Sequence, residues 1–95
     1  MNSRRLHSVF EAYTGGTPAI TSAKFLKMMK DATLLDQDFR QSEVDLIFTK
    51  NKDKGQRTVG YEGFKRAVEM VASKKQVASK DLAEFLIIKC GEGPR

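Results

Sequence analysis

Two short runs of this sequence repeat each other at a fixed distance. The first, ITSAKF, runs from Ile20 to Phe25, and the second, VGYEGF, runs from Val59 to Phe64. Each begins with a β-branched residue and carries phenylalanine five positions later, and the offset is 39 residues at both anchors (59 − 20 and 64 − 25). Because helical periodicity flanks both runs, the repeat predicts two helix–loop–helix units in one chain.

Five segments carry apolar residues at the spacing of an amphipathic helix. Each stripe predicts one buried helix face. The five faces consist of Leu6, Val9, Phe10 and Tyr13; Phe25, Met28, Met29 and Ala32; Val44, Ile47 and Phe48; Phe64, Ala67, Val68 and Val71; and Leu82, Phe85 and Leu86. Candidate N-terminal caps of the second, third and fifth helices are Thr21 or Ser22, a capping box of Ser42 with Asp45, and Ser79.

A helix, a loop with a β-branched residue near its end, and a second helix with an early phenylalanine form the layout of an EF-hand. In a pair of such units, Ile20 and Val59 can meet as a tiny antiparallel bridge between the loops. We therefore predict an all-α fold, a single EF-hand-like domain over residues 1–95 with a C-terminal fifth helix. The ends (about 1–3 and 91–95) are expected to fray. A generic helical bundle with two loops that match by chance is the alternative.

The two loops lack the ligands of a calcium site. Calcium takes about six to eight oxygens, and an EF-hand closes its loop with a bidentate glutamate at position 12. If Ile20 and Val59 stand at position 8, position 12 is Lys24 in the first loop and Gly63 in the second. The first loop has no carboxylate, and the second has only Asp53 among basic residues. We therefore expect no calcium binding.

Other chemistry is equally poorly supported by the sequence. His7 and Cys90 are the only residues of their kinds and lie near opposite ends of the chain, so a zinc site would lack ligands. No catalytic constellation and no cofactor motif is present, and we expect a protein that is not an enzyme. A lone cysteine fits a reducing compartment, and no apolar run is long enough to span a membrane. The predicted location is the cytoplasm.

The net charge is the sequence property that indicates which kinds of partner the protein binds. The net charge is +5 and the isoelectric point about 9.5, which favours anionic surfaces without choosing among them. Basic residues concentrate in the second loop and again after the fourth helix. The candidate partner-binding residues are Lys50, Lys52, Lys54, Arg57, Lys74 and Lys75. The alternative is that these charges only keep the domain soluble.

The segment EVDLIFTKNKDKGQRTVGYEGFKRAVEMV resembles the core of the tubulin polymerization-promoting protein family. FLKMMKDATLL is similar to the second helix of that family, and SKDLAEFLIIKCGEGP to its closing helix. The family pattern is an aspartate–hydrophobic–hydrophobic–phenylalanine run, a lysine-rich loop, and a β-branched residue followed by Tyr-Glu, Phe and Lys. The matching residues are Asp45, Leu46, Ile47 and Phe48; Lys50, Lys52, Lys54 and Arg57; and Val59, Tyr61, Glu62, Phe64 and Lys65.

The resemblance implies an EF-hand-like core that binds and bundles microtubules in cytoskeletal, ciliary or flagellar structures. It does not carry over zinc, because Met29 and Ala32 stand where the vertebrate members have the cysteines linked to that metal. The implied mechanism is capture of the acidic tails of tubulin by the basic loop.

Two other functions stay open. One is a calcium-independent adaptor that holds a partner's helix in a groove, although we expect the fifth helix to fill that groove. The other is nucleic-acid binding, which the absence of aromatic–basic interleaving disfavours.

Overall fold

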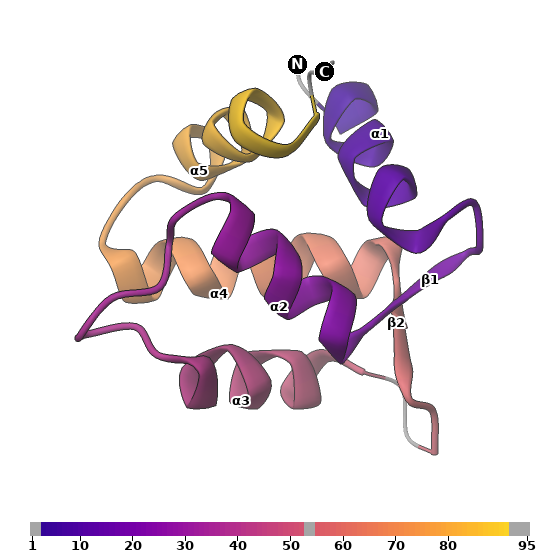
Figure 1. Ribbon diagram of the computed structural model, residues 1–95, viewed down its shortest axis with the longest axis horizontal. Coiled ribbons are helices and arrows are strands. Elements are labelled where there is room, and N and C mark those ends of the chain that lie inside the picture. The colour runs from indigo at the N-terminus through magenta and orange to yellow at the C-terminus, as the bar shows by residue number, and fades with distance from the viewer. Residues whose placement is uncertain (1–2, 53–54, 92–95) are drawn as a thin grey trace.

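The computed structural model describes residues 3–52 and 55–91. Most of the two ends that we expect to fray therefore lies outside the described residues. The chain in these ranges forms five α-helices, two short strands and one π-helical turn (Figure 1). Their bounds are α1 (Ser3–Thr14), β1 (Ala19–Thr21), α2 (Ser22–Asp31), α3 (Gln41–Asn51), β2 (Thr58–Gly60), α4 (Tyr61–Lys75), α5 (Ser79–Leu86) and η1 (Ile87–Gly91). The predicted all-α class is confirmed.

The two helix–loop–helix units meet through their strands. β1 and β2 pair antiparallel, and Ile20 is the register partner of Val59. Both side chains are buried, with exposed fractions of 0% and 2%. The predicted bridge between the two β-branched residues is thus confirmed. It joins α1–β1–α2 to α3–β2–α4 at one end of the molecule (Figure 1).

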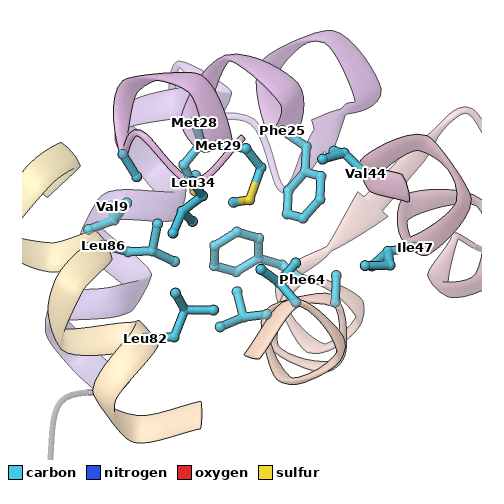
Figure 2. Packing of buried hydrophobic residues seen from close by; sticks show 14 of the residues in the cluster. Val9, Phe25, Met28, Met29, Leu34, Val44, Ile47, Phe64, Leu82 and Leu86 are labelled. Carbon is cyan, nitrogen blue, oxygen red and sulfur yellow. The ribbon is translucent and has the colours of Figure 1, made fainter. Parts of the chain in front are cut away.

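One apolar cluster holds the helices together. Phe64 lies near its middle, with its ring centroid 5.0 Å from that of Phe10 and 6.2 Å from that of Phe25 (Figure 2). Met28 and Met29 are both fully buried. The predicted stripes match the buried positions except at Tyr13 and Phe85, which are only partly buried at the edge of the cluster. Burial of this apolar surface is the main stabilising contribution to such a fold.

The C-terminal segment is an integral part of this core. α5 packs against α1 and α4, and η1 packs against α1 and α2. Leu82, Leu86 and Ile87 have exposed fractions of 3%, 0% and 2%. Figure 2 shows Leu82 and Leu86 pointing toward Phe64 from one side of the cluster. The prediction that the fifth helix fills the space between the EF-hand helices is confirmed.

The three predicted helix caps have different outcomes. Thr21 caps α2 as expected, because its hydroxyl oxygen accepts a hydrogen bond from the main-chain N–H of Lys24 at 3.2 Å. The predicted capping box at Ser42 is wrong, since α3 already begins at Gln41 and its N-cap is Arg40. The predicted cap at Ser79 is also wrong, because Ser79 is the first helical residue and Ala78 is the N-cap.

A local turn at Asp36 explains why α3 begins earlier than the capping pattern suggests. In the linker after α2, the carboxylate of Asp36 accepts hydrogen bonds from the main-chain N–H groups of Asp38 and Phe39, at 2.9 and 2.8 Å. This turn aims the Phe39 side chain into the core, where its exposed fraction is 1%. With Phe39 fixed, the chain enters the helix at once, without a side-chain cap.

Candidate partner-binding surface

The basic loop connects α3 to β2. Asn51 ends α3, where its side-chain amide donates to the Ile47 carbonyl oxygen at 2.9 Å and contacts Met70 Sδ at 3.1 Å. The main-chain N–H of Lys52 donates to Phe48 O at 3.0 Å and closes the helix. Gly55, with a φ of +80°, takes the left-handed conformation that returns the chain to β2.

The described basic side chains in and beside this loop are unneutralised, although Lys50 lies in the last turn of α3 and not in the loop where the sequence predicts it. Lys50 and Arg57 are exposed and Lys52 is half-buried. None of the three forms an ion pair with another described residue. Lys54 lies outside the described residues. The loop therefore presents positive charge to the solvent from a position fixed by α3 and the β1–β2 bridge.

Lys74 and Lys75 do not join this loop. They end α4, whereas the loop lies beyond its start, about 20 Å away along the helix axis. Lys74 Nζ pairs with Glu43 Oε1 at 2.9 Å. Lys75 Nζ donates to Leu34 O at 2.9 Å and to Asp36 Oδ2 at 2.6 Å. Both lysines thus tie the α2–α3 region to α4.

Two comparisons with known proteins place this chain among its relatives. The model of the p25-alpha family matches residues 7–95. The chain belongs to the p25-alpha family. A mouse (Mus musculus) protein, tubulin polymerization-promoting protein family member 2, is 29% identical to it over 69 residues. The match covers 72% of this chain and 41% of the relative, so the chain spans about two fifths of that protein's length.

The resemblance to the tubulin polymerization-promoting protein family is thereby confirmed. In this p25-alpha domain the two positions that close the loops of a calcium-binding EF-hand look unlike ligand positions. Lys24 is exposed on α2 and carries the wrong charge. Gly63 is buried, and a Cβ atom there would stand 2.7 Å from Val59 Cγ1. Neither position carries a side-chain oxygen for a cation.

His7 and Cys90 take part in packing at separate places in the p25-alpha domain. The His7 ring contacts the Tyr61 ring edge-to-face, with centroids 4.5 Å apart, and His7 Nδ1 lies 3.7 Å from Glu11 Oε2. Cys90 Sγ lies 3.6 Å from the Met28 carbonyl oxygen, and burial raises the pKa of its thiol. Within residues 3–52 and 55–91, no three side chains of His, Cys, Asp or Glu gather as metal ligands would.

The length and hydropathy of the described helices determine whether any of them could span a membrane. None of them combines the length and the apolar character that crossing a bilayer requires. Arg66 of α4 is an exposed basic residue outside the set that the sequence predicts for partner binding. One guanidinium nitrogen of Arg66 lies 3.6 Å from where a Cβ atom of Gly63 would stand. Its position eight residues before Lys74 is the sequence signal that places it on the same side of α4.

Proposed function

We propose that this p25-alpha domain binds tubulin in microtubules, without enzymatic activity, and stabilises or organises microtubules in the cytoskeleton, including cilia and flagella. Membership of the p25-alpha family supports a link to tubulin, as does the name of the mouse relative. The observation that carries the proposal is the second loop with the α3 turn before it, where Lys50, Lys52 and Arg57 have no ion pair with another described residue.

The proposed mechanism is electrostatic capture. The tails of tubulin are disordered and strongly acidic, whereas this loop is basic and anchored at both ends by regular structure. Complementary charge speeds the encounter and makes binding sensitive to salt. Lys54 belongs to the same loop and shares this proposed role. Lys74 and Lys75 contribute less to the binding than the loop does, because tubulin must displace Glu43 and Asp36 before it can pair with them.

A co-sedimentation experiment tests this proposal. The domain is mixed with intact microtubules and with microtubules whose acidic tails have been removed by protease. We expect the affinity to fall about tenfold or more on the stripped lattice and on raising the salt from 50 to 200 mM, roughly a halving of the Debye length. Equal binding to the two lattices would contradict tail capture. No binding to either would contradict the proposal as a whole.

A matched pair of variants separates loop charge from overall charge. Lys50→Ala combined with Arg57→Ala removes two unpaired charges, one from the end of α3 and one from the loop that follows it. Lys30→Ala combined with Lys89→Ala removes two charges from the exposed surfaces of α2 and η1. We expect the first pair to weaken sedimentation severalfold and the second to leave it within about twofold. Equal losses would mean that net charge, not the loop, governs binding.

The packing of the core disfavours the alternative function, a calcium-independent adaptor for a partner's helix. It requires a groove between the EF-hand helices that a partner's helix enters. Here Leu82, Leu86 and Ile87 are buried in the common cluster with α1, α2 and α4. A partner helix would first have to displace the C-terminal segment. Localisation of a tagged copy to axonemal or other microtubules supports the proposed function, whereas nuclear or diffuse staining contradicts it.

A further inference from the structure

Helices α3 and α4 lie antiparallel, and three contacts fix how their residues face each other. At one end, Glu43 of α3 pairs with Lys74 of α4 at 2.9 Å. At the other end, the Asn51 side chain contacts Met70 Sδ at 3.1 Å. The Asn51 carbonyl oxygen lies 2.9 Å from the Cβ position of Gly63. Residue numbers therefore rise along α3 in the direction in which they fall along α4.

This register brings two cations opposite each other. Lys50 follows Glu43 by seven residues, two helical turns on the same side of α3. Arg66 precedes Lys74 by eight residues on the same side of α4. Both steps cover about 10–12 Å, so Ala67 and Arg66 lie at the level of Lys50, and of these two only Arg66 is exposed. The placement of the Arg66 guanidinium beside Gly63, close to the end of α3, agrees with this geometry.

The two ends of the α3–α4 surface thus differ in charge pattern. Where Glu43 meets Lys74, a carboxylate neutralises a cation. At the level of Lys50 and Arg66, both side chains are exposed and neither forms an ion pair with another described residue. Two facing cations repel each other, and a carboxylate between them would remove that repulsion. Glu62, four residues before Arg66 on α4, pairs with Lys65 instead.

We propose that Lys50 and Arg66 together bind one carboxylate side chain of an acidic, extended segment of the partner protein. That carboxylate takes the place toward Arg66 that Glu43 takes toward Lys74. A guanidinium binds both oxygens of a carboxylate through its forked donors, and a neighbouring ammonium adds charge. The inference rests on the proposed function and deepens it, because it extends the contact from the basic loop onto α4 through Arg66.

The test uses the whole domain and two charge reversals of equal size. Arg66→Glu and Lys30→Glu each lower the net charge by two, but only the first lies opposite Lys50. A hexaglutamate peptide serves as the direct probe of the carboxylate site, and intact microtubules serve as the probe of the proposed function. We expect Arg66→Glu to weaken both affinities about tenfold more than Lys30→Glu does. Arg66→Lys, which keeps the charge but loses the forked donors, should bind with an affinity between those of the wild type and Arg66→Glu.

Thermal unfolding separates a binding role from a structural role. Arg66→Gln removes the charge without adding a third carboxylate beside Glu62 and Glu69 of α4, so we expect its Tm to equal that of the wild type while its binding falls. A fall in Tm together with lost binding would mean that Arg66 supports the fold, which overturns the inference. If both groups bind one carboxylate, the losses from Lys50→Ala and Arg66→Ala should also be less than additive.

The outcomes distinguish the inference from the proposed function. Binding of hexaglutamate that depends on Arg66, without any binding to microtubules, would overturn the proposed function alone. Equal behaviour of Arg66→Glu and Lys30→Glu toward both probes would overturn the inference, whether or not microtubules bind. A single-stranded oligonucleotide of the same charge that binds more tightly than hexaglutamate would also overturn the carboxylate assignment, and would favour a nucleic-acid partner.

Discussion

The main-chain carbonyl oxygen of Asn51 lies directly against Gly63. A Cβ atom on Gly63 would stand 2.9 Å from this oxygen and 2.7 Å from Val59 Cγ1, and real Cβ atoms essentially never come so close to a neighbour. The oxygen belongs to the last residue of α3, so it cannot retreat unless the helix end moves. The close approach of α3 to the start of α4 therefore requires a residue without a side chain.

The first prediction is that Gly63→Ala destabilises the domain. Alanine favours a helix over glycine by about 1 kcal/mol, but overpacking against a fixed backbone typically costs about 1–3 kcal/mol. Here the backbone contact and a buried β-branched side chain both oppose the new methyl group, so steric repulsion should win. We expect a net loss of about 1–2 kcal/mol in the free energy of unfolding, measured by urea denaturation.

Ser73→Ala is the matched control for this substitution. It also introduces alanine into α4, but at an exposed position near the opposite end. Its effect should be near zero or slightly stabilising, by a few tenths of a kcal/mol at about the difference in helix propensity. A Gly63→Ala variant as stable as this control would show that α3 and α4 can separate without cost.

The same contact leads to a prediction about calcium. Gly63 stands where a calcium-binding EF-hand has its closing glutamate, and the fold leaves no room there for a side chain. Weak extracellular EF-hand-type modules bind calcium with dissociation constants of about 0.1–1 mM, so about 5 mM calcium would raise the Tm measurably if a site existed. We expect no change in Tm, with magnesium as the control for ionic effects. A rise specific to calcium would contradict this account.

The elements that the sequence predicts well are those with strong local signals. The stripes of α2, α3 and α4 and the pairing of Ile20 with Val59 follow from periodicity and from the repeated run. The linker between α2 and α3 is different. Phe39 is buried there, although no helical or strand period marks it in the sequence. The Asp36 turn before Phe39 is local, but the Lys75 side chain that holds Asp36 comes from α4, and no local pattern specifies that contact.

The basic residues show the same limit of sequence reasoning. Composition selects Lys74 and Lys75 as readily as Lys50, but only the structure shows that two of these three have acidic partners. Those partners, Glu43 and Asp36, are more than 30 residues away in the sequence. Arg66 is missed because it lies apart from the basic clusters in the sequence. Its relation to Lys50 follows from the antiparallel register of α3 and α4.

Lys75 and Asp36 give a prediction about pH. The hydrogen bond from Lys75 holds the pKa of Asp36 below its ordinary value of 3.8, with help from the Asp38 N–H. A lowered pKa in the folded state means that this group stabilises the fold above about pH 4. That contribution is lost as the pH falls through the folded-state pKa. Lys75→Met should therefore lower the Tm at pH 7 and flatten its fall between pH 5 and 2.

The comparison for Lys75→Met is Lys30→Met, which removes an exposed lysine from α2. It leaves Asp36 and its donors unchanged, so the acid limb of its Tm curve should follow that of the wild type. Identical acid limbs in all three proteins would show that the contact between Lys75 and Asp36 does not persist in solution.

The C-terminal segment offers a test of the core with an internal control. Leu86 is fully buried, whereas Ile88, two residues later, has an exposed fraction of 65%. Removing a buried leucine side chain to alanine typically costs about 2–5 kcal/mol, since a cavity remains. Leu86→Ala should fall in that range and Ile88→Ala within about 0.5 kcal/mol of the wild type. Similar small losses in both variants would mean that α5 and η1 detach from the core.

The last prediction concerns Cys90, whose thiol donates to the Met28 carbonyl oxygen and whose pKa is raised by burial. Because the thiolate is the reactive form, alkylation of the folded domain should be slow. We expect the rate with iodoacetamide at pH 8 to be at least about tenfold below that in denaturant, where thiols have a pKa near 8.5.

The pH profile of alkylation distinguishes a raised pKa from simple shielding. The unfolded chain should reach a plateau above about pH 9.5, whereas the folded domain should still react faster with each further rise in pH. Mass spectrometry reads a single site, because Cys90 is the only cysteine in the chain. The alkylation rate of N-acetylcysteine in the same buffers corrects for any change in the reactivity of iodoacetamide with pH. Equal rates in the folded and unfolded chains would show that η1 opens readily and leaves the thiol exposed.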